Sequence, residues 1–370
     1  MTRQALTPEQ RRDWLRLART ETVGPVTFHH LIRRYGDTVR ALAALPELAR
    51  RGGRANPPRV ASPADADREI AAGERLGARL IAACEPDFPA QLAALDPPPP
   101  LIWTRGDAHL LPRPCVAIVG ARIASAAGQR FARALAQDLG QAGQVVVSGL
   151  ARGIDGAAHQ GAMATGTVAV LGGGIDDVYP PEHADLYREV VERGCVVSES
   201  PVGAKAQARD FPRRNRLISG LSAAVVVVEA ELRSGSLITA RLAGEQGREV
   251  LAVPGSPLDP RSKGTNDLIR QGAAICEGAE DVLRALSSLR TLREADHEPY
   301  RPFPGDGANL DDAVDALRER IAALLSPTPT PGDELIRITG APAAAVYAAL
   351  TELSLAGRAE LLPGGLVVNG

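Results

Sequence analysis

Short apolar runs, each three to six residues long and mostly rich in valine, recur through the middle of the chain. The runs are residues 116–119, 145–147, 167–171, 195–197, 223–228, 250–253 and 273–276. Patterns with apolar residues three and four positions apart fill most of the gaps, for example at 129–139 and 184–193. Alternation of this kind requires helices on both faces of a parallel sheet. It therefore predicts an α/β fold with a Rossmann-like, doubly wound sheet.

The N-terminal side of this region predicts short helices. Two amphipathic patterns hold residues 14–17 and 28–35, and the turn sequence VGPV lies between them. Such a turn resembles a helix-hairpin-helix or SAM-like unit, which can present N–H groups to phosphate, although a small helical packing module would show the same pattern. Residues 51–58 have the composition of a linker. A helix at 67–76, an apolar run at 78–83 and a proline-flanked strand at 101–103 then predict an edge addition to the sheet.

The C-terminal side predicts a separate small domain. A charged, proline-containing segment follows residue 289, and helical patterns then occupy residues 311–325, 333–338 and 342–356 before the hairpin sequence AELLPGGLVVNG. Three helices and a hairpin are typical of a winged helix-turn-helix. We therefore expect a helical domain at 1–65, an extended Rossmann domain at 66–289, a linker at 290–309 and a winged helix at 310–370.

The composition is typical of a soluble globular protein. The 370 residues are 45% hydrophobic and 23% charged, and no stretch reaches the ~18 apolar residues of a membrane span. The N-terminus lacks the apolar segment of a signal peptide. The four cysteines, Cys84, Cys115, Cys195 and Cys276, are far apart, so we expect buried free thiols and a cytoplasmic protein.

The charge is distributed unevenly. The net charge is −2, yet residues 1–54 hold eleven arginines against five acidic residues, a net of +6. Residues 308–370 hold four arginines against eight acidic residues, a net of −4. Any binding of nucleic acid would therefore depend on a local patch.

Glycine-rich turns follow several of the predicted strands, where doubly wound sheets bind ligands. The first turn leads from Gly120 to Arg122, and Ser125 is placed to cap the next helix. A helix N-terminus after such a turn is a ready anion site, although the glycine could serve the turn alone. A further turn at 171–176 contains three glycines, which allow a ligand or a neighbouring loop to approach closely.

The turn SGLARGID includes Gly149 and is followed by His159. Asp155 and His159 are four positions apart, so they share a helix face and could pair. No nucleophile lies beside them in the sequence. We therefore expect a structural contact between the two side chains that orders the turn.

A cluster of cations is the strongest candidate for a binding site. Its members are Lys205, Arg209, Arg213, Arg214 and Arg216, with Phe211 among them. Guanidinium groups that hold phosphates beside a ring that stacks on a base are typical of single-strand sites. A solvated loop with the ring packed inward would give the same sequence. The turn Ser234-Gly235-Ser236 should lie on the same edge of the sheet.

Several classes of active site are absent from the sequence. It contains no GxxxxGK[ST], HExxH or GxSxG motif, no metal-spaced cysteine or histidine set, and no GxGxxG dinucleotide fingerprint. Binding without a cofactor or catalysis is therefore predicted. The predicted second helix of the winged domain has no lysine or arginine before Arg358, which favours protein contact or autoregulation over duplex reading.

A series of motifs resembles the DNA-processing protein A (DprA/Smf) family. The motifs are VAIVGAR, SGLARGID, GGGID, FPRRNRLISGLS, SGSLITA, GREVLAVPG and KGTNDLIRQGA. The resemblance covers about residues 80–285 and implies a homodimer with an extended Rossmann fold. It implies a protein that binds single-stranded DNA and loads the RecA recombinase during natural transformation, even onto strands covered by single-strand-binding protein.

The resemblance also implies a DNA pocket. Its members would be Arg122, Gly149, Arg209, Phe211, Arg213, Arg214, Asn215 and Arg216, with support from Ser234, Gly235, Ser236, Lys263 and Asn266. The family often has lysine just before its FP-RNR segment, and Arg209 occupies that neighbourhood here.

Two alternatives remain open from the sequence. The same sheet with a Ser-Gly-Ser turn and Glu229 resembles nucleoside-monophosphate phosphoribohydrolases, although their PGGxGT loop is not reproduced. A regulator that binds duplex DNA through the winged helix is the second.

Overall fold

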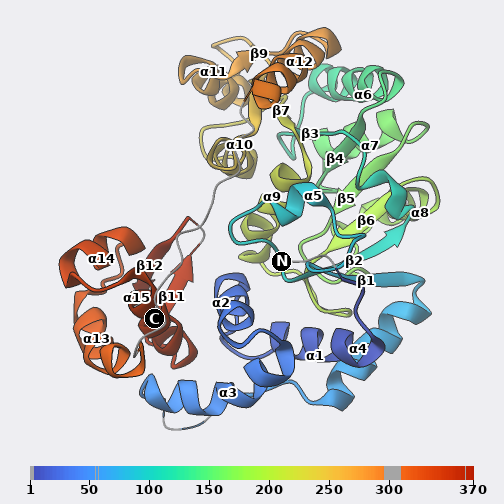
Figure 1. Cartoon of the computed structure of the whole chain (residues 1–370). Coiled ribbons are helices and arrows are strands. Elements are labelled where there is room, and N and C mark those ends of the chain that lie inside the picture. Colours follow the sequence, from blue (N-terminus) through green and yellow to red (C-terminus); the bar gives the residue numbers. More distant parts are fainter. Residues whose placement is uncertain (1–3, 55, 57, 296–309, 363) are drawn as a thin grey trace.

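The computed structural model describes residues 4–54, 56, 58–295, 310–362 and 364–370. The N-terminal helices (blue in Figure 1) lie below a central α/β unit, and the C-terminal unit (red) lies beside them. Residues 296–309, most of the predicted linker, lie outside the described residues.

A nine-stranded sheet forms the central unit. The strands are β1 (Ala78–Ala82), β2 (Leu101–Gly106), β3 (Cys115–Val119), β4 (Val145–Ser148), β5 (Thr167–Val170), β6 (Cys195–Ser198), β7 (Ala224–Val227), β8 (Glu249–Ala252) and β9 (Ala274–Ile275). Their order is β1-β2-β6-β5-β4-β3-β7-β8-β9. In this spatial order all neighbouring strands from β6 through to β9 are parallel, whereas β1 and β2 are antiparallel additions at one edge. The predicted parallel sheet and edge addition are confirmed.

Helices bury both faces of the sheet, because side chains alternate between faces along each strand. Val116 and Ile118 of β3 pack with one set of helices, and Ala117 packs with the other. The first set is α6 (Ala126–Gln141), α7 (Ile154–Ala162) and α12 (Ala279–Ala295), with α8 (Ala184–Arg193) further along the same face. The second set is α5 (Ala90–Ala93), α9 (Asp210–Leu221) and α10 (Gly235–Glu245). The short α11 (Lys263–Arg270) follows β8.

Two element boundaries differ from the sequence predictions. Helix α4 (Pro63–Arg75) begins four residues before the predicted start, because Ser62 and Asp65 form a capping box. Helix α12 continues to Ala295 and so includes residues 290–295, which the sequence assigned to the linker.

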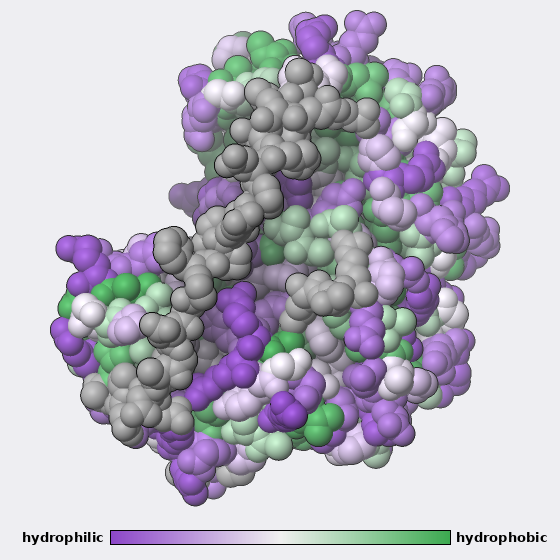
Figure 2. Space-filling view, in the orientation of Figure 1, coloured by the Kyte–Doolittle hydropathy of each residue, from purple (hydrophilic) through white to green (hydrophobic). Residues whose placement is uncertain are grey.

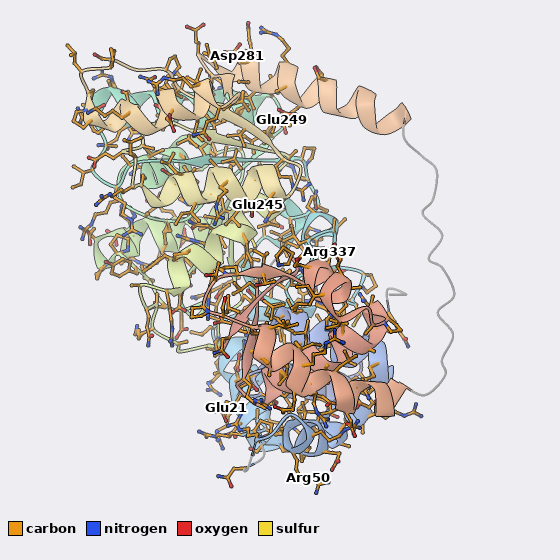
Figure 3. The ribbon with its side chains drawn as sticks, turned by 90° about the vertical axis from the view of Figure 1, so that its left-hand side faces the viewer. Glu21, Arg50, Glu245, Glu249, Asp281 and Arg337 are labelled. Atoms are coloured by element: carbon orange, nitrogen blue, oxygen red, sulfur yellow. The ribbon has the colours of Figure 1, made fainter. Side chains whose placement is uncertain are left out.

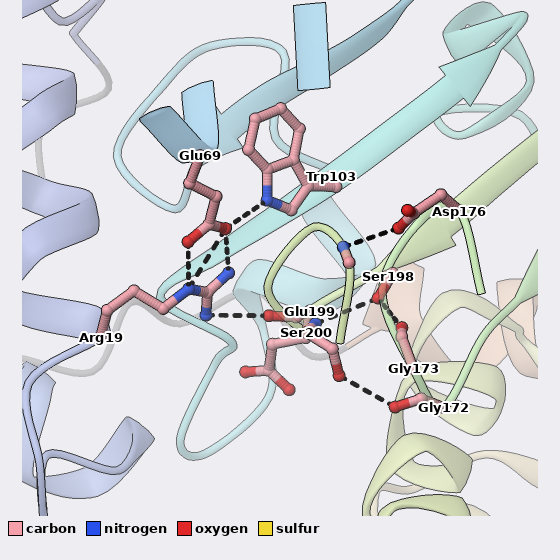
Figure 4. Close-up of polar contacts among 10 residues, drawn as sticks. Arg19, Glu69, Trp103, Gly172, Gly173, Asp176, Ser198, Glu199 and Ser200 are labelled. Atoms are coloured by element: carbon pink, nitrogen blue, oxygen red, sulfur yellow. Dashed lines mark hydrogen bonds and ion pairs between the residues drawn. The ribbon is translucent and has the colours of Figure 1, made fainter. Parts of the chain in front are cut away.

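The N-terminal unit contains α1 (Pro8–Ala18), α2 (Pro25–Tyr35) and α3 (Thr38–Arg51) in addition to α4. Its apolar cluster is continuous with residues of β1, β2 and α8. Trp14 donates an indole hydrogen bond of 2.7 Å to the carbonyl of Pro100. Figure 4 shows a second anchor, in which Arg19 binds Glu69 and donates to the carbonyl of Glu199 at 3.1 Å. These bonds fix the helices to the central unit.

The C-terminal unit has a winged-helix fold with its own core. Its elements are α13 (Leu310–Leu324), β10 (Thr330–Pro331), α14 (Gly332–Thr339), α15 (Ala343–Leu355), β11 (Ala359–Leu362) and β12 (Leu366–Asn369). The hairpin is confirmed, and the two-residue β10 adds a strand that the sequence reading did not include. Figure 3 shows this unit in front of the N-terminal helices.

Burial explains the state of the cysteines. Cys84, Cys115, Cys195 and Cys276 are all buried and free, as predicted, and burial raises the pKa of each thiol. Within the described residues no single helix is long and apolar enough to cross a membrane, although the α14–α15 pair, bent by 117°, has sufficient combined length and hydropathy.

Candidate nucleic-acid interface

The carboxyl ends of the parallel strands place the predicted turns along one edge. The turn at Gly120 follows β3, the turn at Gly149 follows β4, and the glycines from Gly172 follow β5. Helix α9 contacts β3, β4 and β5. It therefore carries the arginine segment to the edge where these turns meet.

Arg214 of α9 is the structural centre of this edge and is 7% exposed. Its guanidinium donates to the carbonyl of Gly149 at 2.8 Å and to the carbonyl of Val170. Burial lowers the pKa of Arg214 to about 10, and the nearby Asp155 opposes this effect, so the group stays charged at neutral pH. Its donors thus hold two turns of the sheet edge together, and its expected contact with DNA stays a prediction.

Glycine is required at position 149 because the guanidinium of Arg214 lies against the backbone there. A Cβ atom there would lie 2.7 Å from the guanidinium nitrogens of Arg214. The next residue, Leu150, has a φ of 57°, a left-handed conformation that is uncommon for leucine. The loop is thus fitted closely around the Arg214 side chain.

Asp155 and His159 hold this loop, but not by pairing with each other. Asp155 accepts hydrogen bonds from the N–H groups of Gly149 and Ala151 at 3.0 and 3.4 Å. His159 accepts from the N–H of Leu150 at 3.3 Å. Burial lowers the pKa of His159 to about 3, so the ring is neutral and can accept. The predicted ordering role is confirmed, whereas the predicted Asp155–His159 contact is wrong, since each side chain binds backbone N–H groups instead.

Arg122 and Phe211 lie against each other, and the Phe211 ring packs beside Gly172. The guanidinium carbon of Arg122 lies 5.3 Å from the centre of the Phe211 ring, a cation–π distance. The Phe211 ring is half-buried and lies 5.4 Å from the ring of Tyr179. Tyr179 is 50% exposed. The residues thus form a small aromatic surface that faces solvent, with a cation at its side.

The predicted anion site at the start of α6 is already filled. Ser125 caps the helix, as expected, and both its N–H and its hydroxyl donate to the carboxylate of Glu229, at 2.9 and 2.6 Å. A carboxylate stabilises a helix N-terminus in the same way that a phosphate would. The expected phosphate site at this helix start is therefore corrected, because Glu229 occupies it.

The other arginines of the segment point in different directions. Arg213 is exposed and lies 3.8 Å from Glu360 of the winged helix. Arg216 is only 13% exposed and pairs with Glu199. Arg209 is exposed just before α9 begins. Arg209 and Arg213 are thus the exposed arginines of this segment, and Lys205 of the same cluster is exposed as well, 3.0 Å from Asp177.

The supporting residues link neighbouring turns. The Asn215 amide donates to the carbonyl of Gly235 at 3.2 Å, which ties α9 to the turn 234–236. Ser234 caps α10 and its hydroxyl lies 2.7 Å from that of Ser236. Asn266 binds both backbone groups of Gly255 through its amide. Lys263, at the start of α11, is exposed.

Comparison with known proteins identifies the family. A family model described as "DNA recombination-mediator protein A" matches residues 79–287, and models of a "DprA-like N-terminal HHH domain" and a "DprA winged helix domain" match residues 8–72 and 307–365. Protein Smf of Escherichia coli K12 is 40% identical over 301 residues, which are 78% of this chain and 76% of that protein. The chain belongs to the DNA-processing protein A (DprA/Smf) family.

Other DprA proteins extend the likeness to structure. The DNA processing protein DprA of Bacillus subtilis is 41% identical over 222 residues, which are 59% of this chain and 75% of that protein. The X-ray structure of DprA from Streptococcus pneumoniae matches with a TM-score of 0.63 at 32% identity, over 76% of this chain and 98% of that one. A structure of DNA processing protein A from Helicobacter pylori matches with a TM-score of 0.51 at 28% identity, over 60% of this chain and 97% of that one. That structure concerns the single-stranded DNA binding mode of the H. pylori protein.

The DprA resemblance and the cation cluster did not single out Tyr179 or the role of Glu229. Tyr179 reaches Phe211 from a loop thirty-two positions earlier in the chain. The sequence signal for Tyr179 is an aromatic residue shortly after the glycine-rich turn at 171–176. Glu229 is the residue that the phosphoribohydrolase alternative would need, and its carboxylate is bound to Ser125. The described residues contain no group of three acidic, histidine or cysteine side chains placed to hold a metal ion.

Proposed function

We propose that this DprA protein binds single-stranded DNA along the carboxyl edge of its sheet and loads RecA recombinase onto that strand during natural transformation. The contact of Arg122 with Phe211 beside Gly172 carries the proposal. A cation next to an accessible ring offers one group for a phosphate and one for a base. The single-stranded DNA binding mode described for the H. pylori relative supports the same ligand.

The residues divide into three roles in this proposal. Exposed cations would hold phosphates, and these are Arg122, Arg209, Arg213 and Lys263. Phe211 and Tyr179 would stack on bases. The remaining predicted members would position these groups through the contacts described above, and they are Gly149, Arg214, Asn215, Arg216, Ser234, Gly235, Ser236 and Asn266. On the face shown in Figure 2, hydrophilic residues cover most of the periphery, so affinity there would come chiefly from charge.

The protein would act as a cytoplasmic homodimer with RecA, and with DNA-bound single-strand-binding protein, as partners. Strand β9 ends the sheet and its Ile275 is 49% exposed, while Leu258 nearby in the chain is 91% exposed. An exposed strand edge with apolar side chains is a suitable surface for pairing with a second chain. The division into 1–65, 66–289, 290–309 and 310–370 is part of the proposal, except that the first domain boundary of the linker moves to the end of α12 at Ala295, and the proposal includes no catalytic step.

Fluorescence anisotropy with labelled oligo-dT tests the binding site. Arg213→Ala should weaken binding, whereas Arg241→Ala should not, although both side chains are 68% exposed and both face a glutamate. Arg241 lies on α10 and is 3.3 Å from Glu245 of the same helix. Phe211→Ala should weaken binding by about tenfold, the value of one stacked base. Equal affinity of all the variants would refute the proposed site.

A second assay tests the mediator role. RecA filament formation on a strand covered by single-strand-binding protein should be faster in the presence of this protein. The Phe211→Ala variant should lose most of this acceleration. No acceleration by a wild-type protein that binds the strand normally would refute RecA loading while leaving single-strand binding intact.

A further inference from the structure

The N-terminal helices hold the winged helix through its helix α15. The hydroxyls of Thr27 and Ser354 lie 3.4 Å apart in a buried contact, and His30 binds the hydroxyl of Thr351 at 3.1 Å. Leu355 is fully buried and belongs to the apolar cluster of the N-terminal unit. Helix α15 has the place of the recognition helix in a winged helix-turn-helix. Its polar face is thus occupied by another part of the same chain.

A buried charge fixes the register of this contact. Glu352 of α15 is 0% exposed. It accepts from Arg318 of the winged helix at 2.6 Å, and Arg51 of α3 lies 3.6 Å from its other oxygen. A fully buried carboxylate is costly unless it is paired. Separation of the winged helix from the N-terminal unit would therefore take Arg51 away from Glu352 and would at the same time expose Leu355.

The two units approach each other closely at Gly52. A Cβ atom on Gly52 would lie 2.1 Å from the backbone oxygen of Glu352. Gly52 has a φ of −69° and a ψ of −6°, so the N-terminal unit alone would accept alanine there without strain. The three atoms nearest to this Cβ all belong to the segment of α15 and its C-cap, so the docked winged helix requires glycine here.

The docked winged helix also reaches the proposed DNA site. Glu360 of β11 lies 3.8 Å from Arg213 of α9. Residues 308–370 carry a net charge of −4, from four arginines and eight acidic residues. A DNA strand at this edge would compete with Glu360 for Arg213 and would be repelled by the acidic unit.

We propose that the surface formed by α2 and α3 is a receptor for α15 of the same chain, and that the docked winged helix is an acidic cover that competes with single-stranded DNA. The inference rests on the proposed function. By linkage, a strand that binds better to the open form favours release of the winged helix, and release strengthens DNA binding to the same extent. Docking also withholds α15 from duplex DNA.

Substitution of Gly52 tests the cover in the full-length protein. Gly52→Ala should open the docked form, with faster hydrogen exchange at α15 and oligo-dT binding about three to ten times tighter. The matched control is Gly24→Ala in the same unit, where a Cβ would meet nothing within 4 Å. Gly24→Ala should change neither the rate of hydrogen exchange at α15 nor the affinity for oligo-dT.

A reversible cross-link keeps the test decisive if Gly52→Ala folds poorly. Thr27→Cys with Ser354→Cys places two thiols where hydroxyls lie 3.4 Å apart, and the four natural cysteines are buried. The oxidised form should bind oligo-dT about threefold or more weakly than the same protein after reduction. Equal binding of the two forms would overturn the inference.

The outcomes separate this inference from the proposed function. If wild-type protein binds no single-stranded DNA, both fail. If wild-type protein binds, and Gly52→Ala speeds exchange at α15 without changing affinity, only the cover is overturned.

Discussion

Replacement of Arg214 should destabilise the folded site, and not only lower its affinity for DNA. The side chain is 7% exposed and its guanidinium serves the carbonyls of Gly149 and Val170. Arg214→Met keeps the length of the side chain but removes these donors and leaves Asp155 without a nearby positive charge. Two hydrogen bonds from a charged donor contribute about 1.5–3 kcal/mol each, so their loss should cost about 3–5 kcal/mol.

This loss converts to a large change in melting temperature. For a domain of this size, each kcal/mol lowers Tm by about 2–4 °C, so Arg214→Met should lower the Tm of the central unit by about 6–20 °C. Circular dichroism during heating measures the change. The matched variant Arg213→Met removes a side chain that is 68% exposed and should stay within about 0.5 kcal/mol of wild type.

The two variants should also separate in their DNA binding. Arg213→Met should remain folded and lose affinity, with a salt dependence shallower by about 0.7 for one lost phosphate contact. If Arg214→Met melts within about 2 °C of wild type, the assignment of Arg214 as the structural centre of this edge is wrong.

Other predictions follow from single contacts. Gly149→Ala places a Cβ 2.7 Å from the guanidinium of Arg214 and should cost about 1–3 kcal/mol of unfolding free energy in urea. Glu229→Gln should cost about 1 kcal/mol by the same measure, because it weakens the cap of α6, and neither it nor wild type should release free base from nucleotides. Burial lowers the pKa of His30 to about 4, so the unfolded chain gains a proton near pH 6.5 that the folded chain does not. Stability should thus fall as pH drops from 6.5 towards 4, by at most about 1.4 kcal/mol per pH unit, and His30→Gln should show a smaller fall in Tm between pH 7 and pH 5.

The fold could be predicted from the sequence because the signals for its helices and strands are local. A continuous run such as 224–227 is buried on both faces, and a capped helix such as α6 starts at its serine. The burial of Arg214 was also available from the helical period, since Arg214 lies on the same face as Leu217, Ile218 and Leu221. A cluster of cations was interpreted as a single site, although Lys205 and Arg209 precede α9 and the arginines within α9 differ in burial.

The features that the sequence did not predict depend on contacts between segments far apart in the chain. Glu229 fills the start of α6 from more than one hundred positions away, and Tyr179 reaches Phe211 from another loop. No periodicity along the chain encodes such pairs. The docking of α15 on the N-terminal helices likewise joins segments at opposite ends of the chain, although the lack of basic residues on α15 already argued against duplex reading.

A binding titration of oligo-dT against a duplex of equal length, over a salt series, tests the central claim most directly. Four exposed cations, Arg122, Arg209, Arg213 and Lys263, predict a slope of log K against log salt of about −3 per protomer for the single strand. We expect the single strand to bind more tightly than the duplex at every salt concentration, and Arg122→Ala to reduce the slope by about 0.7. Preference for the duplex, or a slope that Arg122→Ala leaves unchanged, would contradict the account.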